Sequence, residues 1–519
     1  MATSDKLFGL IKSLTKQEKI YFKTYAKIGK SSNKNYILLF DVIVNQTEYD
    51  ESKIKNRFKN ERFIKQLPVA KDYLFKMIMK SLRMYNDFNP PIHIALKQML
   101  HDINILYDKA LYHSCEKAIL KAKKIAADTE QFFYLNAILG WEKKILLSRG
   151  EGFENREKIQ SILDDQLTVL KKEENTMLFR DLFDNFIAVT INRLTIRNKE
   201  QVTVINTLMQ NPLLQNINNA KSFLSQFYFY KIHHYYNKLF RNRLVSYTYC
   251  ENATKIFELA KNERFLNEYK DLYCNALIDL SIDLAWLGKE TEYDKVYQKF
   301  TNLVAVYPEL KTIVFPRMYV SQTLLYEYTG KFENVTSLSR KFENDLKKFK
   351  GEVPKERLML VYYNFSCLNL AKKDYKEALR WLNKLLNDKN NEVLEDVYCE
   401  ASILKLIVHY ELGNMDLLES LTRSTYRYLL QRNSLYKFEN TVIQFIRTKL
   451  PKINNHKDLI EAFKRLKKEF VKLLNDDFEK SFLDTFDYIS WLESKIENRP
   501  FLQIVQERIS KTRQGVIMK

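Results

Sequence analysis

Four segments of similar layout decide the fold: LAWLGKETEYDKVYQKF (284–300), YEYTGKFENVTSLSRKF (326–342), LNLAKKDYKEALRWLNKLL (368–386) and YELGNMDLLESLTRSTY (410–426). Each contains the end of one apolar helical pattern, a short turn, an aromatic or bulky residue and a second helical pattern. Their turn residues follow one another at intervals of 42, 43 and 40 residues and are Gly288, Gly330, Lys373 and Gly413. A recurrence of this length predicts a helical hairpin that is repeated along the chain.

Weaker copies of the pattern extend toward the N-terminus. Up to Gly288, their turns are spaced by 40, 48, 44 and 46 residues and lie near Ala110, Gly150, Asn198 and Asn242. Gly or Asn at most of these turns supplies the left-handed backbone that ends a helix. Each period has room for two helices of about 16–20 residues, because turns take about 2–8 residues. A single hairpin cannot bury both of its apolar faces, so the pattern predicts an all-α fold, an α-solenoid of about eight to nine long stacked hairpins with a concave groove.

The composition agrees with an ordered helical chain. The 519 residues include 10 Gly and 9 Pro, too few for a collagen-like chain or for an all-β protein with many tight turns. No stretch of 18 uncharged apolar residues occurs, and charges interrupt the N-terminal segment, so we expect no membrane span and no secretory signal. The five cysteines are at least 24 residues apart, which argues against a disulfide framework and favours a reduced, cytoplasmic location.

The chain is predicted to have three parts: a basic N-terminal helical module, a helical-repeat region, and C-terminal capping helices with a basic tail, at residues 1–90, 91–475 and 476–519. The first boundary follows from Pro90 and Pro91, because a helix does not continue through two prolines. The capping helices are expected at 478–492 and 501–510, where they would give the last repeat a polar outer face.

Positive charge is concentrated in the N-terminal module. The whole chain carries 84 Lys and Arg against 64 Asp and Glu, and residues 1–90 carry 18 against 9. Within the module, Thr15 and Glu18 have the spacing of a capping box that opens a helix. We interpret a basic cluster further along either as a solvated rim over an apolar helix face or as a phosphate-contacting surface. The cluster consists of Lys53, Lys55, Arg57, Lys59, Arg62 and Lys65.

The densest aromatic feature is SFLSQFYFYKIHHYYNKLF, residues 222–240. On a helix its rings form stripes nearly all round, which is typical of a helix buried on most sides. The alternative is that one stripe faces the groove and binds a partner, since tyrosine brings contact area and a hydrogen bond at low entropic cost. The stripe with Tyr230 and His234 is favoured for this role. The candidate partner-binding residues are Phe229, Tyr230, His233, His234 and Tyr236.

One segment, AKKDYKEALRWLNKLLND (371–388), resembles a tetratricopeptide repeat. The positions that this family uses for its turn aromatic, small residue and second-helix core are occupied here by Tyr375, Ala378, Leu382 and Leu385. Two of these positions are matched in each neighbouring segment, by Phe332 and Val335 before it and by Met415 and Leu418 after it. The units are longer than the family's period of about 34 residues and lack its terminal proline. The resemblance implies a tetratricopeptide-like architecture for residues of about 92–475.

The N-terminal segments LIKSLTKQEKIYFKTYA (10–26) and YLFKMIMKSLRMY (73–85) resemble the start of a group of uncharacterised bacterial helical-repeat proteins, a likeness that implies no activity. The motifs GxGxxG, GxxxxGK[ST], GxSxG and HExxH do not occur. No histidine lies three or four residues from another histidine or a cysteine, the spacing that places two metal ligands on one helix face. We therefore predict no catalytic residue, no metal site and no cofactor.

These observations favour a non-enzymatic cytosolic scaffold or adaptor that binds a protein or peptide partner in the concave face of the repeats. The alternative is a nucleic-acid-associated regulator, in which the basic N-terminal module contacts DNA or RNA and the repeats sense a partner. An enzyme with a dispersed site is the third hypothesis, and no motif supports it.

Overall fold

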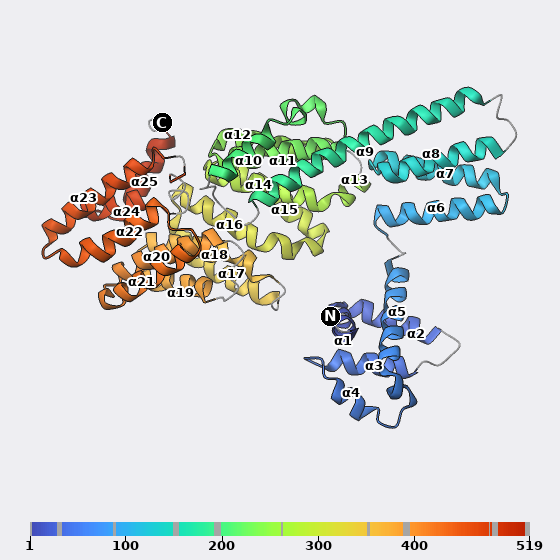
Figure 1. Cartoon of the computed structure of the whole chain (residues 1–519), viewed down its shortest axis with the longest axis horizontal. Helices are drawn as coiled ribbons and strands as arrows, with labels where there is room; N and C mark the ends of the chain where they lie inside the picture. Colours follow the sequence, from blue (N-terminus) through green and yellow to red (C-terminus); the bar gives the residue numbers. More distant parts are fainter. Residues whose placement is uncertain are drawn as a thin grey trace. The chain divides into compact units, whose positions relative to one another are not determined.

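The computed structural model contains helices throughout, and no strand occurs among the residues it describes (Figure 1). The chain divides into two compact units, Met1–Ile125 and Ala126–Lys519. None of the described helices combines the length and the apolar character that a membrane crossing requires. The predicted divisions at residues 90 and 475 stay predictions. The described residues are 3–28, 34–86, 90–148, 155–190, 199–260, 263–349, 353–387, 395–476, 478–479 and 486–513.

The first unit contains a small helical bundle. Helix α5 is its central element and contacts α1, α2 and α3. Phe22, Phe40 and Leu74 are buried in its core. The predicted capping box is confirmed: Glu18 N donates to Thr15 Oγ1 at 3.2 Å, and Thr15 N donates to Glu18 Oε2 at 2.7 Å. In chain order the helices are α1 (Thr3–Ser13), α2 (Lys16–Ile28), α3 (Lys34–Asn45), α4 (Glu51–Arg57), η1 (Arg62–Gln66), α5 (Leu67–Asn86), α6 (Ile92–Asp108) and α7 (Tyr112–Asp128), the last of which ends just beyond the unit.

The second unit holds the remaining helices. They are α8 (Phe132–Ser148), α9 (Arg156–Thr190), α10 (Lys199–Met209), η2 (Pro212–Gln215), η3 (Ile217–Asn219), α11 (Phe223–Leu239), α12 (Arg243–Leu259), α13 (Glu263–Glu268), α14 (Lys270–Trp286), α15 (Glu290–Val306), η4 (Pro308–Leu310), α16 (Lys311–Thr329), η5 (Phe332–Asn334), α17 (Val335–Lys348), α18 (Lys355–Ala371), α19 (Tyr375–Leu386), α20 (Glu395–Glu411), α21 (Met415–Gln431), α22 (Lys437–Gln444), η6 (Phe445–Lys449), η7 (Leu450–Lys452), α23 (His456–Leu473), α24 (Tyr488–Ile496) and α25 (Phe501–Arg513).

Helices α14 to α21 form four successive helix pairs at the four segments that open the sequence analysis. In each pair the two helices contact each other, and the first helices α14, α16, α18 and α20 also contact one another in order. The backbone between the paired helices is left-handed, as predicted, with φ of 62°, 76°, 63° and 72° at Gly288, Gly330, Lys373 and Gly413. Lys373 adopts this conformation without the freedom of glycine.

The upstream turns agree with the predicted pattern less well. Ala110 is left-handed as predicted, but near Asn242 the left-handed residue is Arg241, one position earlier. The expected turns at Gly150 and Asn198 lie outside the described residues. The prediction of two helices between these turns is wrong, because residues 156–190 form one continuous helix, α9. That stretch contains neither glycine nor proline, so nothing in it breaks the helix.

Of the two C-terminal helices, the second is confirmed, since α25 covers the expected residues 501–510, and the first differs from the prediction in position. The first was expected at 478–492, but α24 begins only after Asp487, whose Oδ1 accepts a hydrogen bond from Ser490 N at 3.0 Å. Helix α25 contacts α16, and Gln506 Nε2 donates to Gly330 O at 3.2 Å. Helix α25 therefore packs against the middle of the second unit.

Candidate functional site

The aromatic segment forms α11, and most of its rings belong to the core. Phe229 and His234 are buried, with 5% and 0% of their surface exposed. Tyr230, His233 and Tyr236 are partly exposed. A partner-binding role for these residues stays a prediction, and in this conformation only the partly exposed three present surface for it.

The partly exposed residues are themselves held by neighbours. His233 Nε2 lies 2.9 Å from Leu214 O, and the His233 ring stacks on the Tyr249 ring with their centroids 4.6 Å apart. Burial lowers the pKa of His233, so its ring favours the neutral form. Tyr236 Oη donates to Asn206 Oδ1 at 3.2 Å. These contacts fix the rings as packing elements between α11 and its neighbours.

Helices α11, α14 and α16 share a buried ionic network. Lys231 Nζ donates to Asp279 Oδ2, and Arg317 donates to Asp279 Oδ1. Tyr235 Oη donates to the same Asp279 Oδ2 at 3.0 Å. The Lys231 and Asp279 side chains are only 3% and 2% exposed. One buried carboxylate thus pairs with a buried lysine and a partly exposed arginine.

Opposing effects set the protonation of this network. Burial alone would raise the pKa of Asp279, but the charges of Lys231 and Arg317 outweigh it and hold that pKa well below its ordinary value. Burial alone would lower the pKa of Lys231, and the charge of Asp279 reverses the shift and raises that pKa. Lys231 and Asp279 therefore remain charged at neutral pH.

A second polar group lies one helical turn further along the same helices. His234 Nδ1 lies 3.3 Å from Asp283 Oδ2 and 3.0 Å from Ser246 Oγ. Ser246 Oγ donates to Asp283 Oδ2 at 3.2 Å. The serine and the carboxylate approach the same ring nitrogen, whereas a nucleophilic serine and its orienting carboxylate use opposite nitrogens of the histidine. This arrangement is not a hydrolytic triad.

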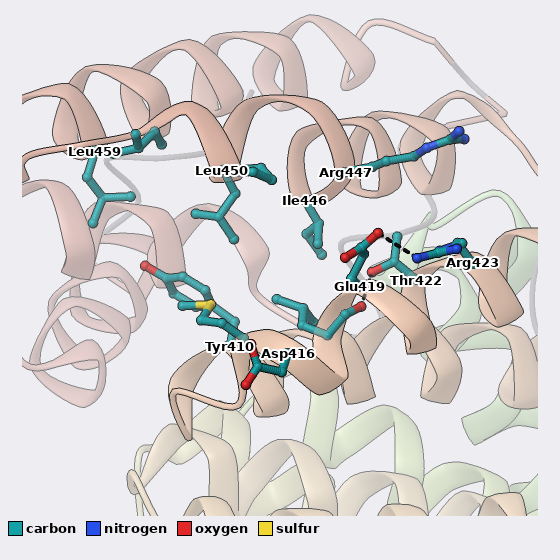
Figure 2. Close-up of a pocket in the computed structure, with 13 residues that line it drawn as sticks. Tyr410, Asp416, Glu419, Thr422, Arg423, Ile446, Arg447, Leu450 and Leu459 are labelled. Atoms are coloured by element: carbon teal, nitrogen blue, oxygen red, sulfur yellow. Dashed lines mark hydrogen bonds and ion pairs between the residues drawn. The ribbon is translucent and has the colours of Figure 1, made fainter.

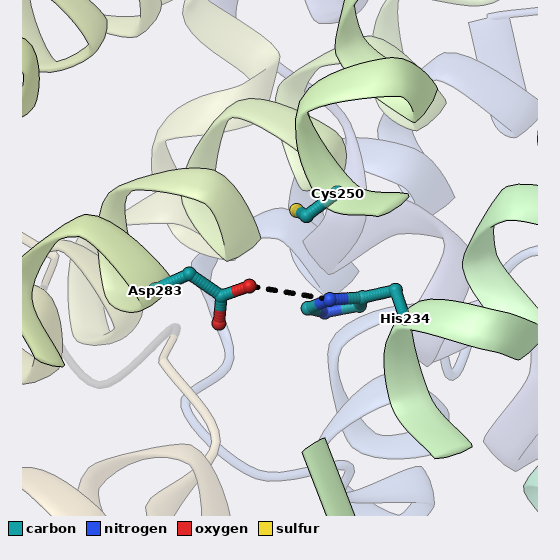
Figure 3. Close-up of side chains that lie close together, drawn as sticks. All are labelled: His234, Cys250 and Asp283. Carbon is teal, nitrogen blue, oxygen red and sulfur yellow. Dashed lines mark ion pairs between the residues drawn. The ribbon is translucent and has the colours of Figure 1, made fainter. Parts of the chain in front are cut away.

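Cys250 of α12 completes this group (Figure 3). One donor atom from each of His234, Cys250 and Asp283 lies within 4.8 Å of the other two, and all three residues are buried. Burial and the charge of Asp283 raise the pKa of Cys250 well above its ordinary value, so the side chain is a thiol as the structure stands. We call the whole assembly the polar core; it consists of Lys231, His234, Ser246, Cys250, Asp279, Asp283 and Arg317.

Sequence reasoning missed the polar core because its members come from different helices. Sequence spacing identifies only ligands that share one helix, whereas these donors come from α11, α12 and α14. One signal was present in the sequence. Asp279 and Asp283 lie four residues apart in a mostly apolar stretch of α14 (276–285), and a charged pair on one face of such a stretch requires buried partners.

The second unit also has a pocket of about 870 Å³ between α21 and the segment η6–η7 (Figure 2). Charged side chains gather at one end, where Glu419 and Arg423 form an ion pair at 2.6 Å. Leu450 and Leu459 lie at the other end. One wall is the π-helical turn η6, a local irregularity that is often found at functional sites. We call this the α21 pocket; its lining includes Tyr410, Met415, Asp416, Leu418, Glu419, Thr422, Arg423, Ile446, Arg447, Leu450, Pro451, Ile453 and Leu459.

The basic cluster of the N-terminal module lies on and after α4. Lys53 and Lys55 form ion pairs with Asp50 and Glu51, at 3.5 and 2.9 Å. Hydrogen bonds from Lys71 and Lys55 lower the pKa of Glu51 to about 2. Three further side chains of the cluster are exposed, those of Arg57, Lys59 and Lys65. The side chain of Arg62 lies outside the part that the structure describes.

The geometry thus offers two places with functional potential in the second unit, one buried and one open. The polar core gathers N, S and O donors, and the α21 pocket combines apolar walls with charged groups. Comparison of the chain with models of protein families, with curated proteins and with solved structures finds no match.

Proposed function

We propose that this protein is a non-enzymatic, cytoplasmic adaptor in which tetratricopeptide-like hairpins form an α-solenoid and bind a segment of a protein partner. Supporting this architecture, α14, α16, α18 and α20 contact one another in sequence order, and each pairs with the helix that follows it. Stacked hairpins of this kind are supported by nearest-neighbour contacts and offer extended binding surfaces.

The observation that carries the binding role is the α21 pocket. Its volume of about 870 Å³ lies within the range of about 300–1,000 Å³ typical of ligand sites. Met415 is 48% exposed there, beside the apolar side chains that line the pocket. Such a surface suits a partner segment with apolar anchors, because their burial supplies most of the binding energy.

Charge at the pocket adds a preference for the partner's polar groups. Glu419 and Arg423 neutralise each other, while Asp416 and Arg447 make no ion pair with the residues that the structure describes. A partner segment that carries one basic and one acidic side chain beside its apolar anchors matches this pattern. Such pairs at the rim favour specificity and association rate more than affinity.

The test is affinity capture with the full chain and a pocket variant. Met415→Asp places a negative charge on the apolar wall of the pocket, and Arg447→Glu reverses the sign of the charge at that position. The matched control changes an exposed valine and an exposed arginine of α23 that do not line the pocket, Val471→Asp with Arg465→Glu. We expect a protein that the wild type and the control retain and that the pocket variant loses.

Direct binding then has to be shown with the purified partner. Calorimetry should give at least a tenfold weaker affinity for the pocket variant than for the control, since a buried hot spot contributes about 2 kcal/mol or more. If both variants capture the same proteins and bind them equally, the α21 pocket is not the docking site.

A further inference from the structure

The most unusual chemistry in the described chain is that of the polar core around His234, Cys250 and Asp283. An imidazole, a thiol and a carboxyl from three helices converge there, with donor atoms within 4.8 Å of one another. Zinc in proteins is bound by this kind of donor set, namely histidine nitrogen, cysteine sulfur and carboxylate oxygen. Calcium and magnesium prefer all-oxygen sites and do not fit it.

Two buried atoms of this group lack a hydrogen-bond partner among the described residues. They are His234 Nε2 and Asp283 Oδ1. Buried polar atoms are nearly always satisfied, and an unsatisfied one costs about 1–3 kcal/mol. Both residues are almost completely buried, so bulk water does not reach them. His234 Nε2 and Asp283 Oδ1 are therefore open to a group from outside the chain, in addition to the Nδ1 and Oδ2 atoms that face each other.

The distribution of charge points to a cation as the missing group. Asp279 pairs with two cations, Lys231 and Arg317. Asp283 receives a hydrogen bond from the neutral Ser246 hydroxyl and faces the His234 ring. The carboxyl of Asp283 therefore has no permanently charged partner among the described residues, although it lies one helical turn from a carboxylate with two.

We propose that His234, Cys250 and Asp283 bind a divalent transition-metal ion, with zinc as the best match. In a tetrahedral zinc site, ligand atoms lie about 3.5 Å apart. His234 Nδ1 and Asp283 Oδ2, 3.3 Å apart, already have this spacing. One donor atom from each of the three residues lies within 4.8 Å of the other two, so the side chains close in when the metal binds. Coordination requires the thiolate, so Cys250 releases its proton when the metal binds.

A fourth ligand is available within the same group. Ser246 Oγ lies 3.0 Å from His234 Nδ1 and 3.2 Å from Asp283 Oδ2, so it or a water molecule can complete the coordination. The site would cross-link α11, α12 and α14, which are consecutive neighbours in the second unit. Because it is fully enclosed, the metal enters during folding, and its function is to hold these helices together. This proposal replaces the sequence-based expectation of no metal site.

The test uses the full chain, refolded from urea with and without one equivalent of Zn²⁺ or Co²⁺ after treatment with a chelator. We expect one tightly held metal ion per chain. The cobalt form should show a sulfur-to-cobalt charge-transfer absorption, which a site without cysteine lacks. Thermal unfolding should occur at a higher temperature in the zinc form than in the metal-free form, since a ligand that binds the native state stabilises it.

Two variants assign the ligands, and a third serves as the control. Cys250→Ser and Asp283→Asn preserve size and should each weaken cobalt binding at least tenfold, and Cys250→Ser should remove the charge-transfer absorption. Cys274→Ser changes another buried cysteine, which is not part of the donor group, and should leave both unchanged. Circular dichroism of each metal-free variant shows whether it has folded.

Either of two results would overturn the proposal. One is that refolded wild-type chain retains no zinc or cobalt after gel filtration, which would leave the unpartnered atoms to a buried water molecule. The other is that wild type and Cys250→Ser bind cobalt equally and with the same spectrum. Neither outcome bears on the α21 pocket, because partner capture is measured with variants outside the polar core.

Discussion

Two regions of the second unit fill the space between their helices in opposite ways. Around α18 and α19, Trp381 packs against Phe365 and Phe342, with ring centroids 4.9 and 6.0 Å apart, and against other apolar side chains. We call this the apolar core. Between α11, α12 and α14, the corresponding space holds the lysine, aspartates, histidine and cysteine of the polar core. Two separate helix pairs of the second unit therefore fill their interiors with different chemistry.

The difference shows which interior is built for packing alone. Apolar filling needs only shape and stabilises by about 25 cal/mol per Å² of apolar surface buried. A buried ionic network is rarely more stable than an apolar replacement, because removing its charges from water costs about as much as their attraction returns. Stability alone therefore does not explain the buried charges of the polar core, and the metal proposal rests separately on the converging donors of His234, Cys250 and Asp283 and on their unpartnered buried atoms.

The largest expected effect comes from removing the shared carboxylate of the polar core. Asp279→Ala leaves Lys231 buried without its partner and should lower local stability by about 3–5 kcal/mol. Native-state hydrogen exchange of α11 and α14 amides measures this opening free energy. Asp271→Ala, at an exposed aspartate of the same helix, is the control. An equally small loss in both variants would mean that Lys231 and Arg317 need no buried partner.

The apolar core should respond to volume rather than to charge. Leu382 is completely buried, and Leu382→Ala should cost about 3 kcal/mol through lost contacts and a cavity. Exchange should rise at α18 and α19 and stay unchanged at α11, because the effects of distant substitutions are independent. Leu382→Met, which nearly preserves volume, should cost less than about 1.5 kcal/mol. A uniform increase across both regions would contradict the separation of the two cores.

Acidification should destabilise helix α20 while leaving the charged polar core unaffected. His409 of α20 is buried, and burial, with the charge of Lys405, lowers its pKa below the ordinary 6.5. The neutral ring is therefore favoured in the folded state, and its contribution is complete above pH 6.5 and is lost as pH falls through the folded pKa. Asp279, with its pKa well below 3.8, keeps its contribution over the same range.

Hydrogen exchange at pH 7 and at pH 5 measures this contrast. The α20 amides should lose protection in the wild type after correction for the intrinsic exchange rate, and the α14 amides should not. His409→Gln removes the titrating group and should abolish the difference at α20. An unchanged pH dependence in that variant would assign the effect to another group.

The smallest effect is expected at the exposed basic cluster of the N-terminal module. The Lys55–Glu51 pair lies at the surface, and Lys55→Ala should change stability by less than about 1 kcal/mol.

The N-terminal module also tests the nucleic-acid alternative. Part of its charge is neutralised by Asp50 and Glu51, so we expect duplex DNA to bind weakly at physiological salt, with a Kd of about 10⁻⁴–10⁻⁶ M. Tight binding that is lost on Arg57→Glu with Lys59→Glu would favour that alternative.

The sequence was informative where local rules determine structure. The capping box at Thr15 and the left-handed turns at Gly330 and Gly413 depend on a few neighbouring residues, and both predictions are confirmed. The long helix α9 was missed because the repeat spacing was taken to require a turn between two helices there. Its sequence contains no helix breaker that would make such a turn. A period of 40–48 residues does not by itself require a break in every unit.

The candidate sites were harder to predict because they depend on contacts between distant segments. His234 was singled out as a groove-facing residue, yet it is completely buried and lies beside Asp283, which is 49 residues away in the chain. Helical periodicity identifies the apolar faces of α11 but not the helix that covers them. The α21 pocket likewise depends on the π-helical turn η6, which no local pattern in the sequence indicates.

The central claim is that the polar core holds a metal whereas the apolar core holds only side chains. X-ray absorption spectroscopy at the zinc edge tests it most directly on the full chain refolded with one equivalent of zinc. We predict a first coordination shell with one sulfur at about 2.3 Å and the remaining nitrogen and oxygen ligands at about 2.0–2.2 Å. A shell of nitrogen and oxygen alone, or a spectrum unchanged in Cys250→Ser, would contradict the claim.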